Sequence, residues 1–334
     1  MERNYDFLSA QNTHNIKKYT LKTATQEWLK AIKMVTKEST YSKYCTVSQL
    51  HIIPNLGEIL LSHITQPLLE QYVYDKYLYG RVDGKGALSA NTVRLITYIL
   101  ESVLQYAKQM GYTNIVYAPI SKPRLSQKNM QLFTIEEQKK LEQFVLTRKD
   151  FSAYGVYICL YTGMRLGELC ALTWENVHLE ERYIRVMQTL QRIQVVDRRE
   201  ENQNKRTKII IDVPKSQSSI RDIPLINTLA NLLERIKGKE EKAYVLTGKS
   251  THFMDPRNYQ KRFKHMLKAC DLQPRNFHTL RHQFASNCIA QGIDAKSLSE
   301  ILGHSSVNIT LNRYVHTSME LKQLQINKLE EWAK

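Results

Sequence analysis

The sequence predicts a mainly α-helical protein that carries one small antiparallel β-sheet and is divided into two domains. Most segments between residues 20 and 332 repeat apolar residues at the three-to-four-residue spacing of an amphipathic helix. The region 182–214 is instead rich in Ile, Val and Thr, as is typical of paired strands. A length of 334 residues and an apolar content of 42% suffice for two buried cores.

The first predicted domain, residues 20–115, is a bundle of helices that follows an N-terminal extension, residues 1–19. We expect its second helix to stop at Pro54, because proline lacks the amide hydrogen that a helix interior needs. The fourth helix should begin after Ser89, a good N-cap, and end at a glycine. The glycine-rich segment before Ser89 is predicted to be a loop. The expected helices are 23–35, 40–53, 66–78 and 89–112.

Residues 116–133 contain two prolines and show little periodicity, so we expect a basic interdomain linker. In the second domain, residues 134–334, strands are expected at 182–196 and 207–214, joined by an exposed polar hairpin tip. A short helix should also follow Arg165. The remaining expected helices are 134–146, 153–164, 226–237, 257–270, 278–291, 295–302, 306–314 and 318–332.

The composition favours a polyanionic partner. Lys and Arg total 48 against 32 acidic residues, a net charge of +16, and the excess is not gathered in one tail. No stretch approaches the roughly 20 apolar residues that span a bilayer, and the first residues lack the apolar core of a secretory signal. A cytoplasmic protein without a membrane partner is therefore expected. The five cysteines match no zinc or disulfide pattern and are expected to be buried free thiols.

Two short stretches contain a cation beside a turn. In TGMRLGELCALTW, Arg165 follows a glycine, and a surface ion pair with Glu168 at i+3 would be enough to explain it. In VPKSQSSIRDIPL, Lys215 fits a solvated turn at the end of a strand. Each signal is weak when it is taken alone.

Two further stretches contain histidines. In HTLRHQFAS, His278 and Arg281 are three residues apart and share a helix face, whereas we expect His282 to point away from that face. In LGHSSVNITLNRYVH, His304 occupies a turn. Tyr314 in the same stretch could be a packing residue, a surface aromatic or a reactive phenol.

Together these residue types supply what metal-free cleavage of a phosphodiester requires. A tyrosine can form a covalent intermediate, but its phenol, with a pKa of about 10, needs a base and a cationic setting. Arginines can bind the nonbridging oxygens bidentately, and a lysine or histidine can protonate the leaving oxygen. The chain has no GxxxxGK[ST] loop and no acidic cluster typical of two-metal catalysis. No cofactor is therefore expected.

These motifs, in this order and spacing, resemble those of the tyrosine recombinases, the phage-integrase family of site-specific recombinases. The resemblance covers about residues 130–334 and rests on TGMRLGEL, the strand-turn lysine, HxxR, LGH and NRYVH. The long hairpin, SSIRDIPL and RLGELCALTW are similar to integrases of conjugative transposons. The resemblance implies a helical core-type DNA-binding domain and an α+β catalytic domain that form a clamp around DNA. The segment before Lys17 looks shorter than the arm-site-binding domain of some integrases.

The resemblance also implies a role for each catalytic residue. Arg165 and Arg281 would bind the scissile phosphate, and His304 would donate a hydrogen bond to it. Tyr314 would attack phosphorus, which gives a 3′-phosphotyrosyl enzyme and a free 5′-hydroxyl. Lys215 would protonate the departing 5′ oxygen.

Other implied contacts support this reaction. His278 would assist proton transfer as the base for the phenol, and Glu168 would orient nearby groups. The start of the fourth helix and the linker present polar side chains that suit phosphates, although an exposed side chain without a DNA contact is the alternative for each. These candidates are Ser89, Asn91, Thr92, Arg94, Lys122 and Arg124.

The expected function is that of a site-specific DNA recombinase that integrates and excises a mobile genetic element without ATP. Its partners would be double-stranded DNA recombination sites and further copies of the chain, a dimer on each site and a tetramer in the synapse. Residues 317–334 would exchange between protomers, with packing in cis as the alternative. Accessory excision factors or host DNA-bending factors could assist. The alternatives are a recombinase that resolves chromosome or plasmid dimers, a type IB topoisomerase and a non-catalytic DNA-binding accessory factor.

Overall fold

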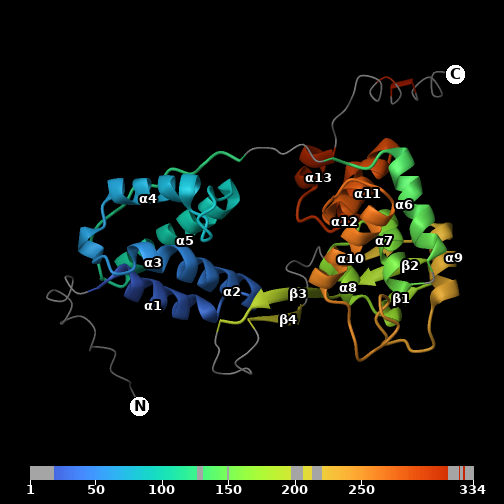
Figure 1. The fold of residues 1–334 in the computed structure, drawn as a ribbon, viewed down its shortest axis with the longest axis horizontal. Coiled ribbons are helices and arrows are strands. Elements are labelled where there is room, and N and C mark those ends of the chain that lie inside the picture. Colours follow the sequence, from blue (N-terminus) through green and yellow to red (C-terminus); the bar gives the residue numbers. More distant parts are fainter. Residues whose placement is uncertain are drawn as a thin grey trace, which may run out of the picture. The chain divides into compact units, whose positions relative to one another are not determined.

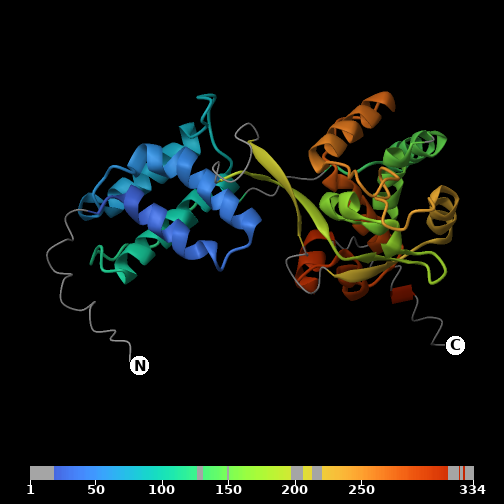
Figure 2. The same ribbon diagram turned by 90° about the horizontal axis from the view of Figure 1, so that it is seen from below.

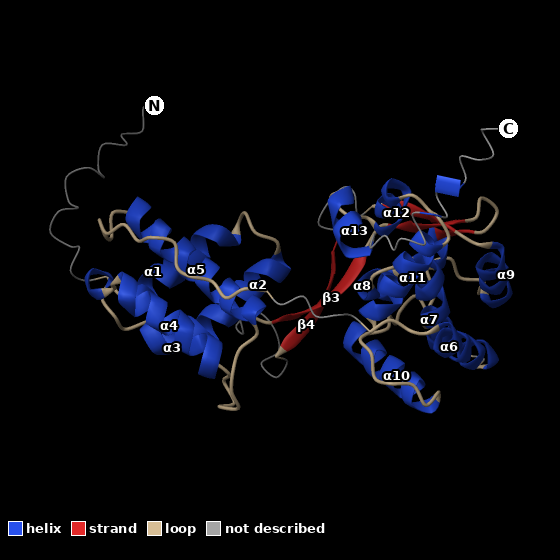
Figure 3. Cartoon of the chain, turned by 90° about the horizontal axis from the view of Figure 1, so that it is seen from above, coloured by secondary structure: helices blue, strands red, loops and turns tan. Residues whose placement is uncertain are grey.

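The computed structural model describes residues 19–125, 131–148, 150–196, 206–212, 220–314, 323 and 326–327. These residues are mainly helical, with a few short strands (Figure 3). The chain divides into two compact units. The N-terminal unit comprises Met1–Lys128 and Ile193–Lys208, and the C-terminal unit comprises Asn129–Arg192 and Ile209–Lys334. The predicted predominance of helices is confirmed.

The N-terminal unit is a helical bundle (Figure 1), as expected for this part of the chain. Helix α5 packs against α1 and α4 and buries one face, including Ile96 and Leu100, because its apolar residues recur at helical spacing. The side chains of Thr20, Thr65 and Ser89 cap α1, α4 and α5. The elements are α1 (Leu21–Lys33), α2 (Glu38–Val47), α3 (Ile53–Leu56), the 3-10 turn η3 (Leu61–His63), α4 (Gln66–Tyr79) and α5 (Ala90–Gln109).

The helix that begins with α2 does not stop at Pro54, so this sequence prediction is wrong. A π-helical turn, η2 (Ser48–Ile52), follows α2 directly and leads into α3, in whose first turn Pro54 lies. The amide of Gly57 donates to the carbonyl of Ile53 over 3.0 Å, which continues the helix beyond the proline. Proline is tolerated in a first turn, where its missing amide hydrogen has no intrahelical acceptor.

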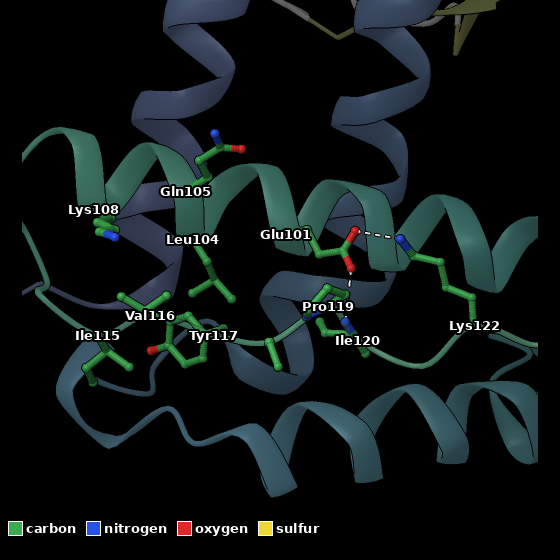
Figure 4. A pocket seen from close by; sticks show the side chains of 11 residues that line it. Glu101, Leu104, Gln105, Lys108, Ile115, Val116, Tyr117, Pro119, Ile120 and Lys122 are labelled. Atoms are coloured by element: carbon green, nitrogen blue, oxygen red, sulfur yellow. Dashed lines mark hydrogen bonds and ion pairs between the residues drawn. The ribbon is translucent and has the colours of Figure 1, made fainter.

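Part of the interval predicted as a linker packs against α5 (Figure 4). Ile120 is only 3% exposed, and its amide donates to Glu101 Oε1 over 3.1 Å. Lys122 Nζ lies 2.7 Å from Glu101 Oε2. Tyr117 lines a cavity of about 380 Å³ between this segment and α5. The N-terminal unit therefore holds the chain for more than ten residues after α5 ends.

The C-terminal unit contains the first of two small sheets, where the sequence predicted one. This sheet is antiparallel, has the order β1-β2-β5 and places Ile184 of β2 opposite Ile223 of β5. A second sheet pairs β3 with β4 (Figure 2). The expected strand 182–196 is thus divided, because Met187 and Gln188 separate β2 from β3. The strands are β1 (Val177–His178), β2 (Tyr183–Val186), β3 (Thr189–Gln194), β4 (Thr207–Asp212) and β5 (Arg221–Pro224).

The outer part of the β3–β4 hairpin belongs to the N-terminal unit. The Ser42 hydroxyl of α2 donates to the carbonyl of Gln194 over 2.7 Å. Lys208 Nζ lies 3.1 Å from Glu38 Oε1. The described part of the outer half of the hairpin therefore has neighbours on α2. The tip, which was predicted to be exposed, lies outside the described residues.

Helix α7 forms the middle of the C-terminal core, where it packs against α6, α9 and α11. Tyr157 is buried, and Tyr154 and Tyr161 are partly buried against the same core. All five cysteines are free and buried, which is also confirmed. The helices are α6 (Ile135–Thr147), α7 (Phe151–Thr162), α8 (Leu166–Ala171), the 3-10 turn η4 (Trp174–Asn176), α9 (Asn227–Ile236), α10 (Pro256–Ala269), α11 (His278–Ala290), α12 (Ala295–Leu302) and α13 (Val307–Tyr314).

Candidate active site

Most of the predicted catalytic residues come together in the C-terminal unit, where α7, α11, α12 and α13 meet (Figure 1). One arginine directly precedes α8, and a histidine and the second arginine lie on α11. Another histidine follows α12, and the tyrosine is the last residue of α13. These residues are Arg165, His278, Arg281, His304 and Tyr314. Lys215 lies outside the described residues.

Both arginines are held by backbone carbonyl groups. Arg281 donates from Nη1 to Gly163 O over 2.9 Å and from Nη2 to Leu302 O over 2.7 Å. Arg165 donates from Nη2 to Gly303 O over 3.0 Å. Each guanidinium has five N–H groups, so donors remain for a further acceptor. Burial, and then the nearby Arg165, lower the pKa of Arg281 to about 9, which leaves it cationic at neutral pH.

Two glycines shape the turns that carry these carbonyls. Gly163 ends α7 with φ 62° and Gly303 ends α12 with φ 65°, the left-handed conformation that favours glycine. A Cβ on Gly163 would lie 2.5 Å from Phe284 Cδ1 and 2.8 Å from Leu302 Cδ2. The glycines of the motifs TGMR and LGH are therefore part of what orients the arginines.

A buried carboxylate joins Arg165 to an arginine that the sequence analysis did not single out. Glu168 is 3% exposed, and its Oε1 accepts from Arg165 Nη1 over 2.7 Å. Its Oε2 accepts from Arg221 Nη2 over 2.8 Å, and Arg221 Nε donates to Ile301 O over 2.5 Å. The expected pair with Arg165 forms, but its carboxylate is inside the protein and not on the surface. Burial opposes ionisation of Glu168, yet Arg221, followed by Arg165, holds its pKa below the ordinary value.

The phenol of Tyr314 contacts His282, the histidine that was expected to point away from the site. His282 Nδ1 lies 2.6 Å from Tyr314 Oη, so that expectation is wrong. Residues four apart also share one helix face, and this spacing is the signal that places His282 beside His278. His278 and His282 are four apart, and their rings meet edge to face at 4.7 Å. Tyr314 also packs against the small core of α11 and α12, including Leu298.

His304 is fixed by the helix that carries the tyrosine. Its Nδ1 lies 2.8 Å from the hydroxyl oxygen of Thr310, which is fully buried. When that hydroxyl donates, Nδ1 is the acceptor and Nε2 carries the proton. The neutral ring then offers Nε2–H as a donor, as binding of a phosphate oxygen would require. The rings of His304 and Tyr314 are parallel within 5°, with centroids 6.5 Å apart.

The electrostatic setting keeps these groups neutral. Burial, and then Arg281, lower the pKa of His304 to about 4. Burial, and then His278, lower that of His282 to about 3. Burial, and then Arg281, also lower the pKa of His278, although this residue is more exposed to solvent as a whole. Burial raises the pKa of the Tyr314 phenol, which Arg281 opposes, so the phenol oxygen is protonated at neutral pH.

The candidate DNA contacts outside this site lie in the N-terminal unit. Ser89 is the N-cap of α5, as predicted, and its hydroxyl accepts from the amide of Thr92 over 3.2 Å. Arg94 donates to the carbonyl of Pro123 over 3.1 Å. Lys122 pairs with Glu101 as described above. Thr92 is half-buried. The other candidates are exposed, including Asn91 and Arg124.

Among the described residues, no group of three or more His, Cys, Asp or Glu side chains is arranged to hold a metal ion. In the same part of the chain, no helix is long and apolar enough to cross a membrane. The segment 317–334, which was expected to exchange between protomers, lies almost entirely outside the described residues.

Comparison with known proteins agrees with this geometry. Residues 133–320 match the Phage integrase family, and residues 20–77 match the phage integrase N-terminal SAM-like domain. A "tyrosine recombinase XerC-like" protein of Caldanaerobacter subterraneus subsp. tengcongensis is 25% identical over 329 residues, which covers 91% of this chain and 81% of the relative. The transposase of transposon Tn916 from Enterococcus faecalis is 25% identical over 218 residues, 60% of this chain. The match spans about half (51%) of that transposase.

Solved structures share the fold. The integrase of transposon Tn1549, in complex with transposon right-end DNA, matches with a TM-score of 0.72 and 20% identity, covering 93% of this chain and 100% of that one. A λ integrase tetramer bound to a Holliday junction matches with a TM-score of 0.61 and 19% identity, over 90% of this chain and 80% of that one. The family match covers more than half of the sequence and includes the site around Tyr314. The chain therefore belongs to the phage integrase family of tyrosine recombinases.

Proposed function

We propose that this tyrosine recombinase integrates and excises a mobile genetic element by cutting and rejoining DNA through a 3′-phosphotyrosyl intermediate. The observation that supports it best is the placement of Arg165 and Arg281. Both guanidinium groups are anchored on the turns around the tyrosine and keep N–H donors for a phosphate. Two cations that flank a phenol can bind the nonbridging oxygens and stabilise the charge of the transition state.

The proposed reaction conserves the number of phosphoester bonds. The oxygen of Tyr314 attacks phosphorus, the bond from phosphorus to the 5′ oxygen breaks, and Lys215 supplies the proton to that oxygen. His304 donates to a nonbridging oxygen, and His278 assists proton transfer from the exposed side of the site. Rejoining reverses these steps with a 5′-hydroxyl from another strand, so no ATP is needed.

The remaining residues have supporting roles in this proposal. Glu168 positions Arg165 through their 2.7 Å contact. We assign residues 20–115 to a core-type DNA-binding domain, 116–133 to a linker and 134–334 to the catalytic domain, after an extension of residues 1–19. The two domains would close around duplex DNA in the cytoplasm. Phosphate contacts in the first domain and the linker would come from Ser89, Asn91, Thr92, Arg94, Lys122 and Arg124.

Assembly on DNA follows from the same proposal. A dimer would occupy each recombination site and a tetramer would form the synapse. Residues 317–334 would dock on a neighbouring protomer. Removal of this segment should leave cleavage by single protomers but abolish stable dimers on a full site, as measured by gel shift on full and half sites.

The test captures the DNA that the protein cuts. A library of duplexes with a random core and a nick beside it is incubated with the protein, and covalent complexes are isolated after denaturation. The wild type should trap a defined sequence, and Tyr314→Phe should trap none. Trapping by Tyr314→Phe would show that the nucleophile is another residue. Absence of any covalent complex with the wild type would favour a non-catalytic DNA-binding role.

The relative that covers 91% of this chain is XerC-like, which favours a second candidate, resolution of chromosome or plasmid dimers. The captured site separates the two functions. It is cloned once on each of two plasmids, to measure integration, or as a direct repeat on one plasmid, to measure resolution. Integration between unlike plasmids supports the proposal, whereas activity confined to direct repeats supports dimer resolution.

A further inference from the structure

The contact between Tyr314 and His282 has no assigned role in the reaction proposed above. The two side chains come from different helices, α13 and α11, and the 2.6 Å separation joins Tyr314 Oη to His282 Nδ1. This length is that of a strong hydrogen bond that involves a hydroxyl group. His282 is 4% exposed, so water does not compete for Nδ1.

The surroundings of His282 determine which partner donates the proton. Its neighbours are His278 and Arg281 on its own helix, Arg313 beside the tyrosine, and His304 after α12. Two of these are arginines, and a third cation beside them is unfavourable, so the His282 ring is neutral. A neutral ring can present a lone pair at Nδ1 while Nε2 holds its proton. The phenol is also neutral, and it donates its O–H to Nδ1.

From this geometry we infer that His282 accepts the phenolic proton when Tyr314 attacks the scissile phosphate, and returns it when the DNA is rejoined. This inference rests on the proposed function and names a further catalytic residue of the same site. The resemblance to the family implies His278 for this step. In the structure, the phenol contacts His282, which lies one turn after His278 on α11.

The step balances in both directions. During cleavage, a lone pair of Oη forms the bond to phosphorus, the O–H proton passes to Nδ1, and the bond to the 5′ oxygen breaks with its electron pair on that oxygen. His282 is then an imidazolium beside the new phosphotyrosyl ester, whose charge partly neutralises Arg165 and Arg281. During rejoining, a 5′-hydroxyl attacks phosphorus and returns its proton to Lys215, which supplied that proton in the proposed cleavage step. The bond between phosphorus and Oη breaks, and Nδ1–H protonates the departing phenol oxygen.

The moment of proton transfer from Tyr314 also fits a neutral histidine of low basicity. A free phenol would not give up its proton to such a ring at neutral pH. Once Oη begins to bond to phosphorus, its acidity rises, and the proton moves to the acceptor that is already in contact. A preformed hydrogen bond avoids the need to reorient either group at that moment.

The experiment measures single-turnover formation of the covalent complex on a nicked substrate of the captured sequence. The substitutions are His282→Asn, which keeps an acceptor near Nδ1 without a basic nitrogen, and His282→Ala. We expect both to slow cleavage by about 100-fold, while DNA affinity in a gel shift is unchanged. The matched control is His265→Asn, an exposed histidine on α10, which should cleave like the wild type.

A fluorinated nucleophile separates proton transfer from positioning. Replacement of Tyr314 by 3,5-difluorotyrosine lowers the pKa of the phenol and so lessens its need for a base. It should speed cleavage by at least about tenfold in the His282 variants and change the wild type much less. Equal effects in the wild type and the variants would show that His282 only positions the ring. His282→Asn within about threefold of the wild type would overturn the inference.

Folding and the proposed function are controlled separately. A variant whose circular dichroism or melting departs from the wild type is replaced by β-thienylalanine at position 282, which keeps the ring shape without a basic nitrogen. If the wild type forms no covalent complex, the proposed function fails. If the wild type traps DNA and the position-282 variants match it, only the inference about His282 fails.

Discussion

Removal of Arg221 should destabilise the C-terminal unit, because the buried carboxylate of Glu168 loses a cationic partner. Arg221→Met keeps most of the side-chain volume but leaves the 3% exposed Glu168 with Arg165 as its one described cationic partner. Breaking a buried ion pair costs about 3–5 kcal/mol. We expect the lower end, about 3 kcal/mol, because Arg165 still contacts the carboxylate.

The double variant isolates the electrostatic part. Addition of Glu168→Gln to Arg221→Met removes the buried charge that has lost one of its two arginine partners, and it should recover about half of the loss. Glu168→Gln alone should be destabilising. Stability is followed by urea unfolding with fluorescence of the buried Trp174. A background with Trp28→Phe and Trp332→Phe leaves Trp174 as the one tryptophan of the sequence.

The pH dependence gives an independent check. The pKa of Glu168 in the folded protein lies below its ordinary value of 4.5. Its stabilising contribution is therefore present above pH 4.5 and is lost as the pH falls through the lower folded-state pKa. The stability difference between the wild type and Arg221→Met should be full at pH 7 and shrink below pH 4.5. A loss under about 1 kcal/mol at pH 7, or a difference that does not change with pH, would refute this reasoning.

Three further predictions concern the turns and caps. Gly163→Ala places a Cβ 2.5 Å from Phe284 Cδ1 at φ 62°. It should lower the free energy of unfolding by about 1–3 kcal/mol and slow covalent-complex formation. Gly238→Ala, where a Cβ has open space, should do neither. Thr310→Val removes the contact that fixes the His304 tautomer. It should slow cleavage about tenfold with little change in DNA binding. Unchanged cleavage would contradict the role of Nε2–H as a hydrogen-bond donor to the phosphate. Ser89→Ala removes the N-cap of α5 and should cost about 1 kcal/mol in thermal unfolding followed by circular dichroism. Equal losses from the exposed Asn91→Ala would show that capping is not the cause.

Long amphipathic segments made the helices predictable. The expected boundaries of the helices around Leu100 and Tyr72 agree with α5 and α4 to within a few residues, because apolar periodicity and the caps act along one short stretch of chain. The residues of the motifs TGMR, HTLR and LGH also come together as their resemblance to a known family implied. In these cases local sequence and tertiary packing favour the same structure.

The wrong or missing sequence predictions share a cause, because each of these features depends on residues that are distant in the sequence or on the wider fold. Pro54 is a helix breaker by local rules, but a π turn before it shifts it into the first turn of α3. The split between β2 and β3 follows from pairing with different strands, which a run of β-prone residues does not reveal. Arg221 and His282 act through Glu168 and Tyr314, which are 53 and 32 positions away in sequence. Only the folded chain shows such pairs.

The backbone anchors of the two arginines bear on how this enzyme could be redesigned. Their partners are the carbonyl oxygens of Gly163, Leu302 and Gly303, and no substitution can delete a carbonyl oxygen. A directed-evolution library that varies exposed positions beside the turn, such as Ser305 and Ser306, can therefore explore new DNA preferences while both guanidinium groups stay in place. The two glycines are the positions that such a library should leave untouched.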